Sequence, residues 1–124
     1  VDLGVTTLEL DVVITADGKV ICSHEPFFNH EITTKPDGTY VEASEERSLN
    51  IYKMTYDQVK TYDVGLKPNP RFPKQQKQKA YKPLLSDLID SVNAWMMTRR
   101  RPFPEFNIET KSAQYLLCTS SVVV

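Results

Sequence analysis

Long apolar runs, cysteines and an excess of charge of either sign are all scarce in this sequence. No apolar stretch approaches the ~20 residues that a membrane helix needs, so no transmembrane segment is expected. The two cysteines, Cys22 and Cys118, are too few to indicate a disulfide framework, and they leave the redox compartment open. A net charge of −1 gives no reason to expect that the whole molecule binds nucleic acid.

A leader sequence is not visible either. The chain begins at Val1 without a methionine or a basic segment, so either a signal peptide has been removed or the sequence is a piece of a longer one. Its composition, with 40% hydrophobic and 25% charged residues, is that of a folded domain. A length of 124 residues suits one ordinary domain or part of a larger one.

The N-terminal region carries the pattern of a β-hairpin. Residues 5–14 (VTTLELDVVI) are rich in β-branched residues and partly alternate, as strands do. The Asp-Gly turn in residues 15–18 leads to a second short apolar run at 19–23. Residues 26–50 are polar and irregular, so we predict a loop there with at most one short strand pair.

A short helix is predicted over residues 55–63. Thr55 and Gln58 have the spacing of a capping box, and Gly65 is placed to end the helix. The following residues 66–83 hold four prolines and six basic residues without an acid, which excludes a regular helix or central strand. Such a long loop is usually functional or disordered, and its charges either attract an anionic substrate or are simply solvated.

The clearest helix is predicted over residues 84–98, where apolar residues recur at helical spacing and Pro102 follows. These residues are Leu85, Leu88, Ile89, Val92, Trp95 and Met96. A second strand is predicted over 105–110, whereas residues 112–124 give no firm assignment. Two strands separated by a helical crossover favour a parallel α/β arrangement.

Acidic side chains lie on one face of each predicted strand. Glu9 and Asp11 alternate with leucines and valine, and Glu109 lies on the second strand. If the strands are neighbours, three carboxylates converge and repel one another unless a positive charge offsets them. Carboxylate oxygens suit Mg²⁺ or Ca²⁺ rather than zinc. Solvated acids on an exposed strand are the alternative, although the run Val12–Ile14 argues for a buried strand.

The two histidines differ in their surroundings. His24 ends the returning strand of the hairpin beside Pro26 and close to the predicted acidic face, where α/β proteins place their chemistry. A packed or surface histidine is the alternative. His30 lacks such a context and is predicted to be a surface loop residue.

These motifs resemble those of the glycerophosphodiester phosphodiesterase family. The family pattern of acid-x-acid, Thr-x-Asp-Gly and a strand ending in His-Asp is matched by Glu9-Leu10-Asp11, Thr15-Ala16-Asp17-Gly18 and His24-Glu25, with Glu25 in place of the usual Asp. The later signature, acid-x-Lys, is matched by Glu109-Thr110-Lys111, and Pro83-Leu84-Leu85 matches the helix opening. The resemblance spans residues 4–111 and is greatest to bacterial secreted members, which implies a periplasmic or secreted location and leaves a cytoplasmic one open.

The resemblance implies a fragment of a (β/α)8 TIM barrel, covering about its second and third strands. Residues 1–124 would form a partial domain that lacks the first strand and the C-terminal half. It implies metal-dependent hydrolysis of glycerophosphodiesters to an alcohol and glycerol 3-phosphate. The implied roles are divalent-cation ligands for Glu9, Asp11 and Glu109, acid–base catalysis for His24, and contact with substrate phosphate for Lys111.

Some alternatives remain open on the sequence alone. The family's first-strand His-Arg-Gly, which brings a second histidine and an arginine, is absent from these residues, so we expect the chain alone to be inactive. It is then a non-catalytic fragment, or a partial domain that binds a cation or phosphodiester. A phosphatidylinositol-type phospholipase is a further alternative. For Lys111, the alternative to phosphate contact is an ion pair with Glu109 or Asp11. The head group, the native cation and the oligomeric state are left open.

Overall fold

A mixed β-sheet organises the chain, as the computed structural model shows for residues 1–111 and 121–123. The four strands are arranged in the order β2-β1-β3-β4. Their bounds are β1 Thr7–Ile14, β2 Val20–Cys22, β3 Glu105–Thr110 and β4 Ser121–Val123. The predicted hairpin and the predicted strand 105–110 are confirmed, whereas β4 lies in a region that had no assignment. Cys118 lies outside the described residues.

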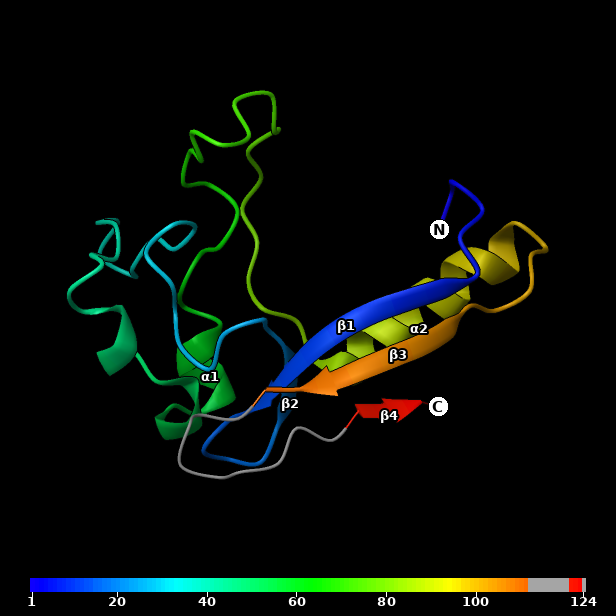
Figure 1. Cartoon of the computed structure of the whole chain (residues 1–124), viewed down its shortest axis with the longest axis horizontal. Helices are drawn as coiled ribbons and strands as arrows, with labels where there is room; N and C mark the ends of the chain where they lie inside the picture. The colour runs from blue at the N-terminus through cyan, green and yellow to red at the C-terminus, as the bar shows by residue number, and fades with distance from the viewer. Residues whose placement is uncertain (112–120, 124) are drawn as a thin grey trace.

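The two acid-bearing strands are parallel neighbours. β1 pairs with β3 in the register Glu9↔Asn107 and Asp11↔Glu109, and β2 pairs with β1 antiparallel. The connection from β1 to β3 includes α2 (Leu85–Thr98), which lies against one face of the two strands (Figure 1). The predicted parallel pair with a helical crossover is therefore confirmed.

Helix α2 follows the predicted stripe with one exception. Met96 is buried, but Trp95 is 42% exposed and its indole N–H donates to Asp2 Oδ1 at 3.0 Å. Trp95 thus belongs to the apolar stripe by its spacing but lies at the surface, where Asp2 of the N-terminal segment gives it a polar partner. The helix ends in a Schellman motif in which Arg101 N–H donates to Met96 C=O and Arg100 has φ of 53°.

The predicted helix at 55–63 is a single turn, α1 (Tyr56–Val59), and two 3₁₀ turns precede it at Glu46–Ser48 and Ile51–Lys53. The capping box is confirmed: the Thr55 hydroxyl accepts from Gln58 N–H, and the Gln58 side chain accepts from Thr55 N–H. The helix does not reach Gly65, so the expectation that Gly65 ends it is wrong. A Cβ at Gly65 would lie 2.0 Å from Gln78 C=O, so this position requires glycine for close backbone contact.

A small core forms between the hairpin and the irregular segment that follows it. Its buried members are Val13, Ile21, Phe28, Ile51 and Val59. The segment from residue 24 to α1 extends from the carboxyl ends of β1 and β3, on the side away from the start of β1 (Figure 1). Because buried apolar residues anchor that segment to the hairpin, it has a defined position beside these strand ends.

The proline-rich loop is closed at its base by Asp63. The carboxylate of Asp63 accepts hydrogen bonds from the backbone N–H groups of Gly65, Leu66 and Ala80, at 2.7–3.0 Å. Burial would raise the pKa of Asp63, but the three N–H donors outweigh it and lower that pKa. The predicted loop at 66–83 is confirmed as irregular. Among the described residues, no helix has the length and apolar character of a membrane span.

Candidate active site at the strand ends

The three predicted acids come together on one side of the sheet. Carboxylate oxygens of Glu9, Asp11 and Glu109 all lie within 4.8 Å of one another. The parallel register places Asp11 directly beside Glu109, and strand alternation puts Glu9 on the same face. Glu9 is exposed, while the other two are partly buried. The sequence therefore correctly predicted both the face and the neighbouring strand.

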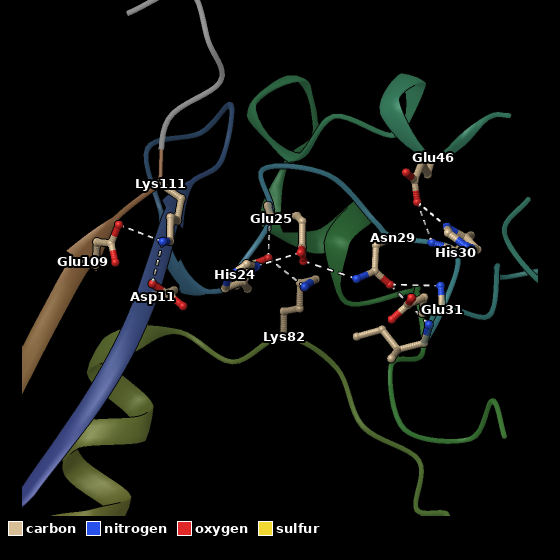
Figure 2. Close-up of polar contacts among 12 residues, drawn as sticks. Asp11, His24, Glu25, Asn29, His30, Glu31, Glu46, Lys82, Glu109 and Lys111 are labelled. Atoms are coloured by element: carbon tan, nitrogen blue, oxygen red, sulfur yellow. Dashed lines mark hydrogen bonds and ion pairs between the residues drawn. The ribbon is translucent and has the colours of Figure 1, made fainter. Parts of the chain in front are cut away.

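Lys111 lies among these carboxylates. Its Nζ is 2.7 Å from Glu109 Oε1 and 3.3 Å from Asp11 Oδ1 (Figure 2). The hydrogen bond to Glu109, followed by the contacts with Asp11, raises the pKa of Lys111. The pairing that was the alternative to phosphate contact is thus present in this structure.

One carboxylate oxygen of Asp11 accepts no hydrogen bond from the described residues. This oxygen, Oδ1, is buried, and its contact with Lys111 Nζ, at 3.3 Å, is an ion pair. A buried carboxylate oxygen without a donor is costly. When ionised, the acids carry −3 and Lys111 brings this to −2. The donor set, all oxygen with a double negative charge, fits a hard divalent cation.

His24 directly follows the residue that pairs with Asp11. Ser23 N–H donates to Asp11 C=O at 2.9 Å, which fixes the start of the turn that carries His24. The imidazole is 70% exposed, and its Nδ1 lies 2.7 Å from Glu25 Oε1. Because an ionised carboxylate only accepts, Nδ1 carries the proton in this pair and Nε2 is the nitrogen available for chemistry.

His30 occupies a different environment, as expected of a loop residue. Its Nδ1 lies 2.7 Å from Glu46 Oε2, and its backbone N–H donates to the same oxygen. Glu46 thereby ties residue 30 to the 3₁₀ turn, and the hydrogen bond from His30 lowers the pKa of Glu46. These contacts account for His30 structurally.

Sequence reasoning missed Lys82. It belongs to the basic loop segment, but it is only 7% exposed and its Nζ donates to Ser23 Oγ at 2.7 Å. Burial lowers its pKa to about 8. Nothing in the local sequence separates Lys82 from the exposed lysines before it. Its position follows from Cys22 N–H, which donates to Pro83 C=O and draws the end of the loop against β2.

Comparison with known proteins places this arrangement in a family. The model of the glycerophosphoryl diester phosphodiesterase family matches residues 1–120. The chain belongs to this family. The resemblance inferred from the acid-x-acid, His24-Glu25 and Glu109-Thr110-Lys111 motifs is therefore confirmed, and the TIM-barrel fold is the fold of the family.

A solved structure agrees with this assignment. This chain is similar in structure to a provisionally assigned glycerophosphoryl diester phosphodiesterase from Silicibacter pomeroyi DSS-3. The TM-score is 0.73 and the sequence identity is 28%. The match covers 90% of this chain and 38% of that protein, so the chain spans well under half of its solved relative. A search among curated proteins found no match.

Proposed function

We propose that the chain supplies part of the active site of an enzyme that hydrolyses glycerophosphodiesters to an alcohol and glycerol 3-phosphate with a divalent cation. The observation that carries the proposal is the convergence of the carboxylates of Glu9, Asp11 and Glu109, one of which has a buried oxygen that accepts no hydrogen bond from the described residues, in a member of this family. We further propose that β1 and β3 correspond to the second and third strands of a (β/α)8 barrel. Active sites of such barrels lie at the carboxyl ends of the strands.

Glu9, Asp11 and Glu109 are the residues that would hold the cation. Mg²⁺ and Ca²⁺ both accept such ligands. When bound, the cation would act as a Lewis acid toward the phosphoryl group. The ligands come from two adjacent strands, so the sheet rather than a loop sets their relative positions. Lys111 would turn from its carboxylate partners toward phosphate oxygens and neutralise their charge.

His24 would move the proton. With Nδ1 held by Glu25, its Nε2 would give a proton to the leaving alkoxide or remove one from the nucleophile. The exposed position of the ring leaves this nitrogen accessible to a substrate. The substrate proposed is a small phosphodiester, and the proposed location is periplasmic or secreted, which rests on resemblance alone. The family's second histidine and its arginine are not among these residues, so we expect no turnover from the 124-residue polypeptide assayed alone.

Two measurements test the proposal in the protein as its gene encodes it. Release of glycerol 3-phosphate from glycerophosphocholine should require Mg²⁺ or Ca²⁺, and calorimetric titration should detect binding of the cation. Asp11→Asn should abolish both, because it removes a ligand charge. Glu105→Gln is the matched control, since Glu105 lies on the same face of β3 but at the far end of the strand, paired with Thr7. Cation-independent hydrolysis, or equal effects of the two substitutions, would contradict the proposal.

A further inference from the structure

Lys82 is a buried cation beside the candidate active site. Its side chain passes over Phe28, with Nζ 5.6 Å from the ring centre, and ends at the hydroxyl of Ser23. Lysines of the same loop, such as Lys74 and Lys77, are exposed. Burying an ammonium group is unfavourable unless it gains compensating contacts, so this position calls for an explanation beyond packing.

The hydrogen bond of Lys82 continues into the turn that carries His24. The hydroxyl of Ser23 accepts from Lys82 Nζ at 2.7 Å and donates to Glu25 C=O at 2.6 Å. The backbone on both sides of His24 is therefore closed into one hydrogen-bonded turn. Ser23 is itself only 6% exposed, so water does not readily replace either partner.

The side chain of Glu25 fixes the ring that this turn presents. Its Oε1 accepts from His24 Nδ1 and its Oε2 accepts from Asn29 Nδ2 at 3.3 Å. In Figure 2, His24 is drawn between Asp11 on one side and Glu25 and Lys82 on the other. Lys82 and Glu25 also attract each other electrostatically. The Lys82 ammonium group thus contacts the turn through the Ser23 hydroxyl, and it attracts the Glu25 carboxylate electrostatically.

We propose that Lys82 is a positioning residue for the reaction: through the Ser23 hydroxyl it holds residues 23–25 so that the His24 imidazole is set for proton transfer beside the acidic cluster. The inference rests on the proposed function. It adds Lys82 as a residue that affects the reaction only through Ser23 and His24. Lys82 itself does not touch the substrate. Its loss should therefore change the rate of the chemical step and leave binding of the substrate and of the cation nearly unchanged.

A double-mutant cycle tests this assignment. Lys82→Met keeps most of the side-chain volume and removes the ammonium, and Ser23→Ala removes the hydroxyl that links it to the turn. Each should lower kcat about 10- to 100-fold, the usual range for residues that orient a reacting group. KM and the cation Kd should change less than about threefold. Because both changes break the same link, the double variant should be no slower than the slower single variant.

The control is Lys60→Met, which removes an exposed lysine paired with Asp57 at 2.9 Å and should leave kcat unchanged. Additive losses in kcat, an unchanged kcat in Lys82→Met, or losses confined to KM would overturn the positioning role. If Lys82→Met does not fold, Ser23→Ala decides, since it cuts the same link while Lys82 remains.

Different measurements test the positioning role of Lys82 and the proposed function, so the failure of one can be distinguished from the failure of the other. If the unsubstituted protein does not release glycerol 3-phosphate, the proposed function has failed. The positioning of His24 is then judged by the NMR signals of its imidazole carbons. A shift of these signals in both Lys82→Met and Ser23→Ala, and not in Lys60→Met, supports the link. Unshifted signals overturn it.

Discussion

Lys111 and Glu109 form an ion pair of 2.7 Å at the end of β3, two residues apart on the same face. The Lys111 backbone N–H donates to Val12 C=O at 2.8 Å, so the residue is fixed to β1 as well as to its own strand. A cation bound by the three acids would have to share Glu109 and Asp11 with this ammonium group. Lys111 is therefore both a competitor of the cation and, once displaced, a donor placed to meet an anionic substrate.

This dual position predicts opposite effects of Lys111→Met on two measurements. Removing the ammonium should tighten cation binding about two- to fivefold, the size of effect expected for a partly exposed ion pair. The same substitution should lower kcat/KM for a phosphodiester, because a phosphate contact is lost. Calorimetry measures the first effect and steady-state kinetics the second. Lys53→Met, at an exposed lysine, is the control, and weaker cation binding by Lys111→Met would show that Lys111 supports the site instead of competing.

A second prediction separates the two histidines. His24→Ala should reduce hydrolysis about 10²- to 10⁴-fold, the contribution typical of acid–base groups, and leave the cation Kd nearly unchanged. His30→Ala should change the rate little, because the ring of His30 contacts Glu46 and not the acidic cluster. Rates are compared at saturating substrate and cation. A normal rate in His24→Ala would refute the proton-transfer role.

The sequence could predict the parts of this site that depend on strand geometry. Alternation alone puts Glu9 and Asp11 on one face, and the helical crossover makes parallel pairing with the strand of Glu109 the expected topology. The actual register, Asp11 beside Glu109, then brings the carboxylates together. The sequence can therefore predict that Glu109 and Asp11 lie close together, because their positions follow from the regular alternation of strand residues.

Lys82, Gly65 and Trp95 could not be assigned in the same way. The burial of Lys82 depends on where the end of a long loop meets β2, and the need for glycine at position 65 depends on Gln78, across that loop. Trp95 follows the apolar periodicity of its helix but hydrogen-bonds Asp2. In each case a contact between distant segments decides the role of the residue, and local propensity and spacing carry no information about it.

The close approach at Gly65 gives a prediction for stability. Gly65→Ala would place Cβ 2.0 Å from Gln78 C=O, which is backbone and cannot rotate away. The base of the loop must then open, which weakens the hydrogen bonds that Gly65 N–H and Ala80 N–H donate to the Asp63 carboxylate. We expect the free energy of unfolding to fall by about 1–3 kcal/mol. Gln76→Ala, at an exposed position of the same loop, is the control, and equal urea midpoints for the two variants would contradict this account.

The buried ammonium of Lys82 predicts a pH dependence of unfolding with a definite sign. Its pKa is about 8 in the fold because of burial, against an ordinary value of 10.5. Below pH 8 the group is protonated in both states and the fold bears the full cost of burying the charge. Between pH 8 and 10.5 the folded protein releases this proton while the unfolded chain still holds it, so this group makes the fold more stable as the pH rises.

Comparison with Lys82→Met isolates this contribution. Burial raises the pKa of Cys22, which makes stability fall with rising pH in the same range, but this contribution is largely shared by the parent and the variant. The stability of Lys82→Met relative to the parent should therefore decline between pH 7 and pH 10.5, by an amount on the order of 3 kcal/mol. Urea unfolding at both pH values measures it, and Lys60→Met should not show this decline. A relative stability that rises over this range would show that Lys82 is stabilised in its charged form by stronger contacts than those with Ser23 and Glu25.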